Sequence, residues 1–403
     1  MKNARNLVIG ATLFALLGAL GAVRHSLEAG VAAQGNGNGK GNTVTVPRYE
    51  VDPTFPKPMP NGWYQGMTIG ATVDAQDHIW VIHRPDSLSP SENAALMRTG
   101  SCCAKAPPVL EFDQAGNLLR HWGGPGEGYD WPENNHGIMV DPKGNFWTGG
   151  NSNRDGQVLK FSADGKFLGS FGRKAPADSA DVTKYGGVAT MSFDPTTNEA
   201  YVADGYYNHR VAVADIDTMK IKRYWGAYGN KPDDADMGNY NPDAPPLQQF
   251  RLPVHCAAFS HVEKLVYVCD RRNDRIQVFS TDGKFIKEKI IAQRTLGNGS
   301  VWEIAFSRDP QQKFMFVTDG ANMKVWILDR ASMEILTSFG TGGKQPGQFY
   351  AVHSIALDSK SNIYTTETFD GRRLQRFLYK GMQTIEKGKD QLTVWPRSAT
   401  STN

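Results

Sequence analysis

The chain has 403 residues, of which 40% are hydrophobic and 21% are charged. This balance supports a sizeable buried core and excludes a disordered chain. The formal net charge of +3 excludes a protein that binds nucleic acid by neutralising many phosphates. The abundance of glycine (42) and tryptophan (9) favours a turn-rich β protein over a helical one.

The amino-terminal segment has the pattern of a targeting signal. Lys2 and Arg5 precede an apolar run from Leu7 to Val23, and small residues follow at 31–33. This order predicts a signal peptide over residues 1–33 and a secreted or periplasmic protein with no further membrane contact. The alternative, an uncleaved anchor, is disfavoured because the run is short and rich in alanine and glycine. Residues 34–43, rich in glycine and asparagine, predict a linker.

Four cysteines in an exported chain allow three pairings. Cys256 and Cys269 flank a turn, so two antiparallel strands would place them opposite each other. A bond between the adjacent Cys102 and Cys103 would be strained and stays open as an alternative. A catalytic thiol is disfavoured, because an oxidising compartment would consume a free thiolate.

From residue 44 to residue 385 one unit recurs six times, and a polar tail follows over 386–403. Each unit starts with an apolar strand that ends in Asp or Ser, and three further strands follow. The end residues of the first strands are spaced by 47 to 67 residues and are Asp74, Asp141, Asp194, Ser260, Ser307 and Asp358. Four strands in a repeat of this length predict an all-β, six-bladed β-propeller. Separate β-sandwich domains are the alternative.

Two long insertions and an amino-terminal strand add to the six repeated units. Insertions at 85–108 and about 227–252 account for the two longest spacings, and we expect both to emerge on one face and form a lid. A propeller is closed by a strand from one chain end, and Thr43 to Val51 has the composition to complete the last blade.

Histidines occupy one position of the repeat in alternate units. Five residues before the end of the first strand lie, in order, Ile69, His136, Ala189, His255, Trp302 and His353. Alternate blades of a six-bladed ring are about 120° apart, so the three imidazoles would meet on the axis. Three neutral imidazoles with an open fourth position suit catalytic Zn²⁺, and Cu, Ni or Fe would accept the same donors. The alternative is that each histidine only lines a wet channel.

Loops on the same face supply further candidates. Arg84 follows the second strand of the first unit, and Tyr206 and Tyr207 lie in the corresponding loop of the third unit. We expect these side chains near the metal. Acidic and basic residues in such loops also cap strands in propellers without activity. That structural role is the better interpretation for Asp204, Arg210, Asp270 and Arg275.

Several phrases resemble a known family. Arg-Ile-Gln-Val-Phe (275–279) and Gly-Gln-Phe (347–349) resemble NHL repeats. The further details resemble the lyase of peptide amidation, peptidyl-α-hydroxyglycine α-amidating lyase. This resemblance implies a six-bladed propeller with an axial three-histidine zinc, which cleaves a peptide ending in α-hydroxyglycine into a peptide amide and glyoxylate.

The resemblance also implies roles for individual residues. The zinc ligands of the lyase match His136 in His-Gly-Ile (136–138), His255 in Pro-Val-His (253–255) and His353 in Val-His-Ser (352–354). Tyr206, in Asp-Gly-Tyr-Tyr-Asn-His-Arg (204–210), matches the catalytic tyrosine and would be the general base. Arg84, in His-Arg-Pro-Asp (83–86), matches the active-site arginine and would steady negative charge or hold a carboxylate.

The chain also departs from the lyase pattern. Ala351 stands where the lyase has a methionine near the substrate, and Ser354 stands where it has an aspartate that helps hold a structural calcium. A structural Ca²⁺ is therefore not expected. Six blades use the chain from 44 to 385 and leave no companion monooxygenase domain, so a separate hydroxylating enzyme would supply the substrate.

Two other functions compete with this interpretation. A non-catalytic NHL propeller would bind a protein, peptide or glycan on the same face. Another propeller enzyme, such as a lactonase or a streptogramin-type lyase, is the third possibility. Lactonases use carboxylates around calcium, and the shared position holds no acidic set.

Overall fold

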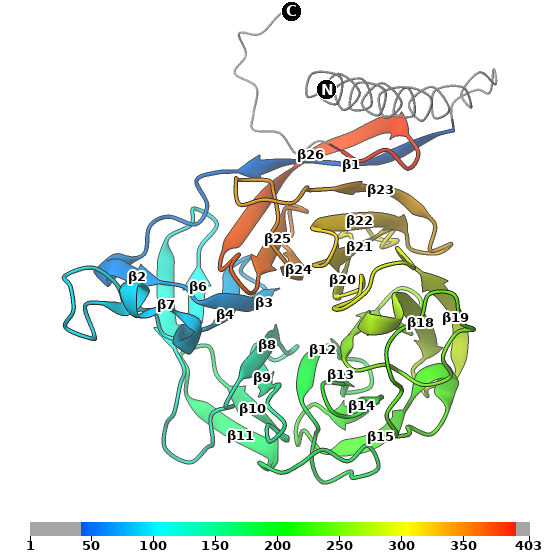
Figure 1. The fold of residues 1–403 in the computed structure, drawn as a ribbon, viewed down its shortest axis with the longest axis horizontal. Coiled ribbons are helices and arrows are strands. Elements are labelled where there is room, and N and C mark those ends of the chain that lie inside the picture. Colours follow the sequence, from blue (N-terminus) through cyan, green and yellow to red (C-terminus); the bar gives the residue numbers. More distant parts are fainter. Residues whose placement is uncertain (1–41, 392–403) are drawn as a thin grey trace, which may run out of the picture. The chain divides into compact units, whose positions relative to one another are not determined.

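The computed structural model describes residues 42–391. The predicted signal peptide over 1–33 lies outside the described residues, as do most of the linker and most of the carboxyl-terminal tail. Within the described range, six four-stranded antiparallel sheets are arranged as blades around an axis (Figure 1). The predicted all-β, six-bladed propeller is confirmed.

The first three blades follow one another along the chain. Blade 1 consists of β3 (Met67–Val73), β4 (Ile79–Arg84), β6 (Val109–Phe112) and β7 (Leu118–Trp122). Blade 2 consists of β8 (Asn135–Val140), β9 (Phe146–Gly150), β10 (Gln157–Phe161) and β11 (Phe167–Gly172). Blade 3 consists of β12 (Val188–Asp194), β13 (Glu199–Asp204), β14 (Arg210–Asp215) and β15 (Ile221–Trp225).

The last three blades complete the ring. Blade 4 consists of β16 (Val254–Ser260), β17 (Leu265–Asp270), β18 (Arg275–Ser280) and β19 (Phe285–Ile290). Blade 5 consists of β20 (Glu303–Phe306), β21 (Phe314–Asp319), β22 (Lys324–Asp329) and β23 (Ile335–Phe339). Blade 6 combines β24 (Val352–Leu357), β25 (Ile363–Glu367) and β26 (Leu374–Glu386) with β1 (Thr43–Asp52). The amino-terminal strand thus closes the ring, as the sequence predicted.

The insertions contain short elements. Residues 85–108 include the 3₁₀ helices η2 (Pro85–Ser87) and η3 (Pro90–Asn93), and β5 (Ala104–Lys105), which pairs in parallel with β2 (Trp63–Tyr64). The 3₁₀ helix η1 (Pro60–Gly62) precedes β2, and η4 (Ala227–Gly229) begins the second insertion. The 3₁₀ helix η5 (Arg271–Asn273) joins β17 to β18.

One aromatic position of the repeat builds the core. The second strand of each blade has a fully buried aromatic side chain at its second or third residue. These side chains are Trp80, Trp147, Tyr201, Tyr267, Phe316 and Tyr364. Several of these rings donate a hydrogen bond to the aspartate that directly follows the first strand of the same blade. Trp80 Nε1 donates to Asp74 Oδ2 at 2.8 Å, and the Tyr364 hydroxyl donates to Asp358 Oδ2 at 3.0 Å. The recurring Asp therefore satisfies the polar edge of a buried ring.

Both cysteine pairs are disulfide-bonded, Cys102 with Cys103 and Cys256 with Cys269. The second bond joins β16 and β17, where the two cysteines are paired across the strands. Among residues 42–391, no helix has the length and apolar character needed to cross a membrane.

Candidate metal centre

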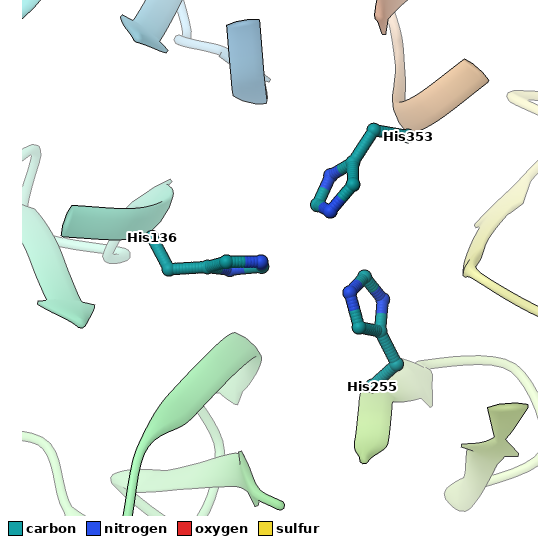
Figure 2. Close-up of side chains that lie close together, drawn as sticks. All are labelled: His136, His255 and His353. Carbon is teal, nitrogen blue, oxygen red and sulfur yellow. The ribbon is translucent and has the colours of Figure 1, made fainter. Parts of the chain in front are cut away.

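Three histidine side chains converge on the propeller axis from blades 2, 4 and 6. His136, His255 and His353 are the second residues of the innermost strands β8, β16 and β24, and one nitrogen of each lies within 4.8 Å of the other two. Figure 2 shows the three rings pointing toward a common point. They are 2%, 1% and 4% exposed, so the centre is nearly closed to bulk water.

A local irregularity of the strand accompanies each histidine. The pairing register with the second strand shifts between His136 and Ile138, between Val254 and Cys256, and between Val352 and Ser354. Such a bulge locally changes the direction of a side chain on an otherwise alternating strand. The repeat thus places a bulged residue at the axial end of each of these strands.

The next blade fixes the orientation of each ring. His136 Nδ1 lies 2.8 Å from the carbonyl oxygen of Ala189, and His255 Nδ1 lies 2.6 Å from that of Trp302. His353 Nδ1 has no hydrogen-bond partner among the described residues, and the nearby carbonyl of Ile69 only partly opposes the fall in the pKa of this imidazole. Because a carbonyl only accepts, Nδ1 of His136 and of His255 carries the proton, and Nε2 keeps its lone pair for the axis.

All three imidazoles are held neutral. Burial is the main cause that lowers the pKa of His136 and His255 well below the usual value, and it lowers that of His353 to about 3. The charge of Arg271 lowers all three values further. Neutral imidazoles with free Nε2 atoms are the form that binds a transition metal.

The Tyr206 hydroxyl joins this donor set. Its oxygen lies 2.9 Å from His136 Nε2 and 3.1 Å from His255 Nε2. The single hydroxyl proton can be donated to only one of these two nitrogens. The other nitrogen lone pair and the hydroxyl oxygen then lie close together without a proton between them. A cation there would satisfy them, and the residues present therefore fit a divalent metal such as zinc.

Buried polar contacts hold the Tyr206 loop in place. The Tyr206 amide donates to the carbonyl of Gly187 at 2.9 Å. Below it, Arg210 Nε donates to Asp204 Oδ2 at 2.7 Å, and both side chains are fully buried. Asp270 and Arg275 make the equivalent contact in blade 4, also at 2.7 Å. These four residues have the strand-capping role that the sequence favoured.

Two guanidinium groups flank the centre. Arg84 Nε donates to the carbonyl of Asn135, the neighbour of His136, and its Nη2 donates to Asn151 Oδ1. Arg271 is 6% exposed and lies 4.6 Å from the ring of Trp302. Burial lowers the pKa of both arginines, and Tyr206 opposes this shift in each case. Neither arginine has an ion pair with a carboxylate of the described residues, which leaves both available to an anion.

Arg271 was not singled out from the sequence. It lies between β17 and β18, in the loop that corresponds to the Tyr206 loop of blade 3, and that correspondence was the available signal. Tyr207, which was singled out, is 39% exposed, and its side chain has no hydrogen bond to any described residue. The structure therefore brings Arg84 and Tyr206 to the centre, whereas Tyr207 has no hydrogen bond or ring contact with the three histidines.

The positions that depart from the lyase pattern have their own contacts. Ser354 Oγ accepts a hydrogen bond from the Ala71 amide at 3.1 Å. The carboxyl group of Glu303, a residue that was not predicted from the sequence, lies near Ser354. Burial raises the pKa of Glu303 to about 7. A methionine of the neighbouring blade lies beside Ala351. The sulfur of Met323 is 3.1 Å from the amide nitrogen of Ala351.

Comparison with known proteins gives distant relatives. No protein-family model matches the chain. Peptidylglycine α-amidating monooxygenase of Rattus norvegicus is 26% identical over 314 residues, which cover 74% of this chain and 29% of that protein. Peptidyl-glycine α-amidating monooxygenase B of Xenopus laevis is 25% identical over 308 residues, which cover 74% of this chain and 32% of that protein. The predicted resemblance to peptide-amidating enzymes is confirmed. The match spans about a third of the length of these relatives.

Solved structures of propeller proteins also match. An inactive variant of virginiamycin B lyase from Staphylococcus aureus has a TM-score of 0.43 and 14% identity, with 83% of this chain and 88% of that chain covered. A streptogramin B lyase has a TM-score of 0.45 and 11% identity, with 84% and 98% covered.

Proposed function

We propose that this protein is an exported, zinc-dependent carbon–nitrogen lyase that cleaves peptidyl- or N-acyl-α-hydroxyglycine to an amide and glyoxylate. One observation carries the proposal: three converging imidazoles, the Tyr206 hydroxyl that lies against two of them, and two guanidinium groups without carboxylate partners share one centre. The distant similarity to peptide-amidating enzymes supports it. The two disulfides support the exported location, because such bonds persist in oxidising compartments.

The arginines account for substrate binding. An α-hydroxyglycine end carries a carboxylate, and the half-buried Arg84 and the buried Arg271 are cations that lack one. A charge-assisted hydrogen bond between a guanidinium and a carboxylate is about twice as strong as a neutral one. The two side chains would orient the carboxylate so that the adjacent carbinol faces the three histidines.

Tyr206 is the residue placed to move the proton. Its oxygen, in the ionised form, accepts the proton of the carbinol hydroxyl while the C–N bond breaks. The electron pair of that bond stays on nitrogen, which takes up the proton that Tyr206 has accepted and leaves as the amide, and the carbinol carbon becomes the aldehyde carbon of glyoxylate. Arg84 and Arg271 both interact favourably with a negative charge on the Tyr206 oxygen. Zinc held by His136, His255 and His353 would make the hydroxyl proton easier to remove near neutral pH.

The test is glyoxylate release from N-acetyl-α-hydroxyglycine by the purified full chain, measured before and after treatment with a chelator. We expect about one zinc per chain, release of one glyoxylate per amide, loss of activity on chelation and recovery on zinc addition. Protein that contains zinc and releases no glyoxylate would contradict the lyase. Full activity after complete metal removal would contradict the zinc dependence.

A further inference from the structure

The second strand ends in an acidic residue in blades 3 to 6, and blades 1 and 2 depart from this pattern. The four acidic residues are fully buried and are Asp204, Asp270, Asp319 and Glu367. At the same position, β4 ends in Arg84 and β9 ends in Gly150. Gly150 is paired with Asn135, whose carbonyl accepts a hydrogen bond from Arg84. The two departures therefore lie together, in neighbouring blades and beside the metal centre.

Blade 2 keeps the structural role of the missing acidic residue but assigns it to Asp155. In blades 3, 4 and 6 the carboxylate accepts a backbone amide of the segment before the first strand, in the pairs Gly186–Asp204, Arg251–Asp270 and Tyr350–Glu367. In blade 2, Asp155 accepts the amides of Glu133 at 2.8 Å and Asn134 at 3.1 Å. A Cβ at Gly150 would collide with the Asp155 carboxylate. The acidic group thus binds the same segment from a position further along the chain.

A neutral amide takes the place beside Arg84. Asn151 directly follows Gly150, and its Oδ1 accepts from Arg84 Nη2 at 2.8 Å and from Asn134 Nδ2 at 2.6 Å. A guanidinium group only donates, so the atom that faces Arg84 is the amide oxygen. The backbone amide of Asn151 also donates to the carbonyl of Asn134 at 2.9 Å. The side chain and the backbone of Asn151 are therefore both held in place.

Arg84 keeps its charge and part of its hydrogen-bonding capacity. Its Nε donates to the carbonyl of Asn135 and its Nη2 donates to Asn151, so both acceptors are uncharged. Within residues 42–391, Nη1 has no hydrogen-bond partner and Arg84 has no ion pair. Burial lowers the pKa of this arginine, and the charges of Tyr206 and Asp155 oppose that shift. A carboxylate that reaches Nη1 would meet a cation that no ion pair neutralises.

We propose that Asn151 is a positioning residue of the centre, which holds Arg84 by a neutral oxygen and leaves its charge for the carboxylate of the substrate. The inference rests on the proposed lyase function and explains how Arg84 stays available in it. An aspartate at position 151 would form an ion pair with Arg84 and compete with the substrate. The displacement of the blade 2 carboxylate to Asp155 avoids this competition.

The test measures how the full chain binds a carboxylate that it cannot cleave. N-acetylglycine lacks the carbinol hydroxyl, and N-acetylglycinamide also lacks the charge. We expect calorimetry to show that the parent binds the acid about tenfold more tightly than the amide, or better. Asn151→Asp should lower this preference to about threefold or less, because the new carboxylate pairs with Arg84 and repels the anion. The KM for N-acetyl-α-hydroxyglycine should rise with it.

Two further variants separate this role from support of the loop. Asn153→Asp adds the same charge at an exposed position of the same loop and should keep the parent preference. Asn151→Ala removes the acceptor without adding a charge and should weaken binding of the acid less than Asn151→Asp does. Asn151→Asp retains an acceptor for Arg84 and Asn134, so its midpoint of urea unfolding should not fall. A larger loss of acid binding in Asn151→Ala than in Asn151→Asp would indicate loop support and overturn the inference.

The binding and turnover measurements distinguish this inference from the lyase function. Glyoxylate release, together with a preference for the acid that Asn151→Asp leaves intact, overturns this inference alone. Absence of glyoxylate, together with a preference that Asn151→Asp removes, overturns the lyase function and supports the role of Asn151 at an anion site. Equal binding of acid and amide by the parent overturns the carboxylate site and this inference together.

Discussion

Replacing Arg271 with methionine separates a role in substrate binding from a role in packing. Methionine keeps an unbranched side chain against the ring of Trp302, 4.6 Å from the present guanidinium, and removes the charge. Arg271 is 6% exposed, so solvent screens its interaction with an anion only weakly. A hydrogen bond to a charged group contributes about 1.5–3 kcal/mol. We therefore expect Arg271→Met to lower kcat/KM for N-acetyl-α-hydroxyglycine by about 10- to 150-fold.

The same variant should bind metal more tightly. Arg271 lowers the pKa of His255 and His353, second only to burial, and a cation that disfavours a protonated imidazole also disfavours a bound divalent ion. Removing the charge therefore lowers the dissociation constant of zinc, measured by competition with a chromogenic chelator. Arg294→Met, which removes an exposed arginine paired with Asp243, is the control and should change neither quantity. Weaker zinc binding with unchanged kcat/KM would refute this reasoning.

Three further predictions follow from the site and its surroundings. Tyr206→Phe removes the proton acceptor and should lower kcat by about 10²–10⁴-fold with unchanged zinc content, whereas Tyr207→Phe should remain active; ordinary turnover by Tyr206→Phe would refute the base assignment. His136→Ala, His255→Ala and His353→Ala should each lose stoichiometric zinc by metal analysis while circular dichroism stays that of a β protein, and the exposed His261→Ala should keep its zinc. Burial raises the pKa of Asp274 to about 7, so the folded state favours the protonated acid, and this contribution to stability declines as pH rises from about 4 through 7. Asp274→Asn should therefore gain about 2–4 kcal/mol over the parent at pH 8 relative to pH 4, measured by urea unfolding, and an identical pH dependence of both proteins would contradict the assignment.

The sequence predicted the parts of the molecule that repeat. Each blade reuses the same aromatic position and the same end of the first strand, so six imperfect copies revealed both the architecture and the shared position of the histidines. The loop that carries Tyr206 was recognisable because its place in the repeat puts it on the face of the histidines and because its phrase at 204–210 resembles that of the amidating lyase. These signals are periodic or local, and a single sequence contains them.

Arg271 and Glu303 escaped prediction for a different reason. Arg271 lies in the short helix η5, which is followed by Asp274 with a left-handed φ of 53°, and this local turn determines where its side chain goes. Glu303 directly follows the shared axial position, but only blade 5 has an acidic residue there. A residue that occurs in one copy of a repeat has no periodic signal, and only the assembled ring shows what it faces.

The alternation of the blades also explains why the residues at the shared position of blades 1, 3 and 5 differ so widely. Blades 2, 4 and 6 direct imidazoles to the axis, and the odd blades that follow them present backbone carbonyls to these rings. The carbonyls of Ala189 and Trp302 bond to Nδ1 of His136 and His255, whereas that of Ile69 lies near His353 without a hydrogen bond. The backbone does this work, so the side chains at these three positions are free to differ as widely as alanine, tryptophan and isoleucine do. Two blades that look unrelated to the metal centre in sequence thus fix the tautomers of His136 and His255. A sixfold ring becomes a threefold donor site because neighbouring blades divide the two nitrogens of each imidazole between them.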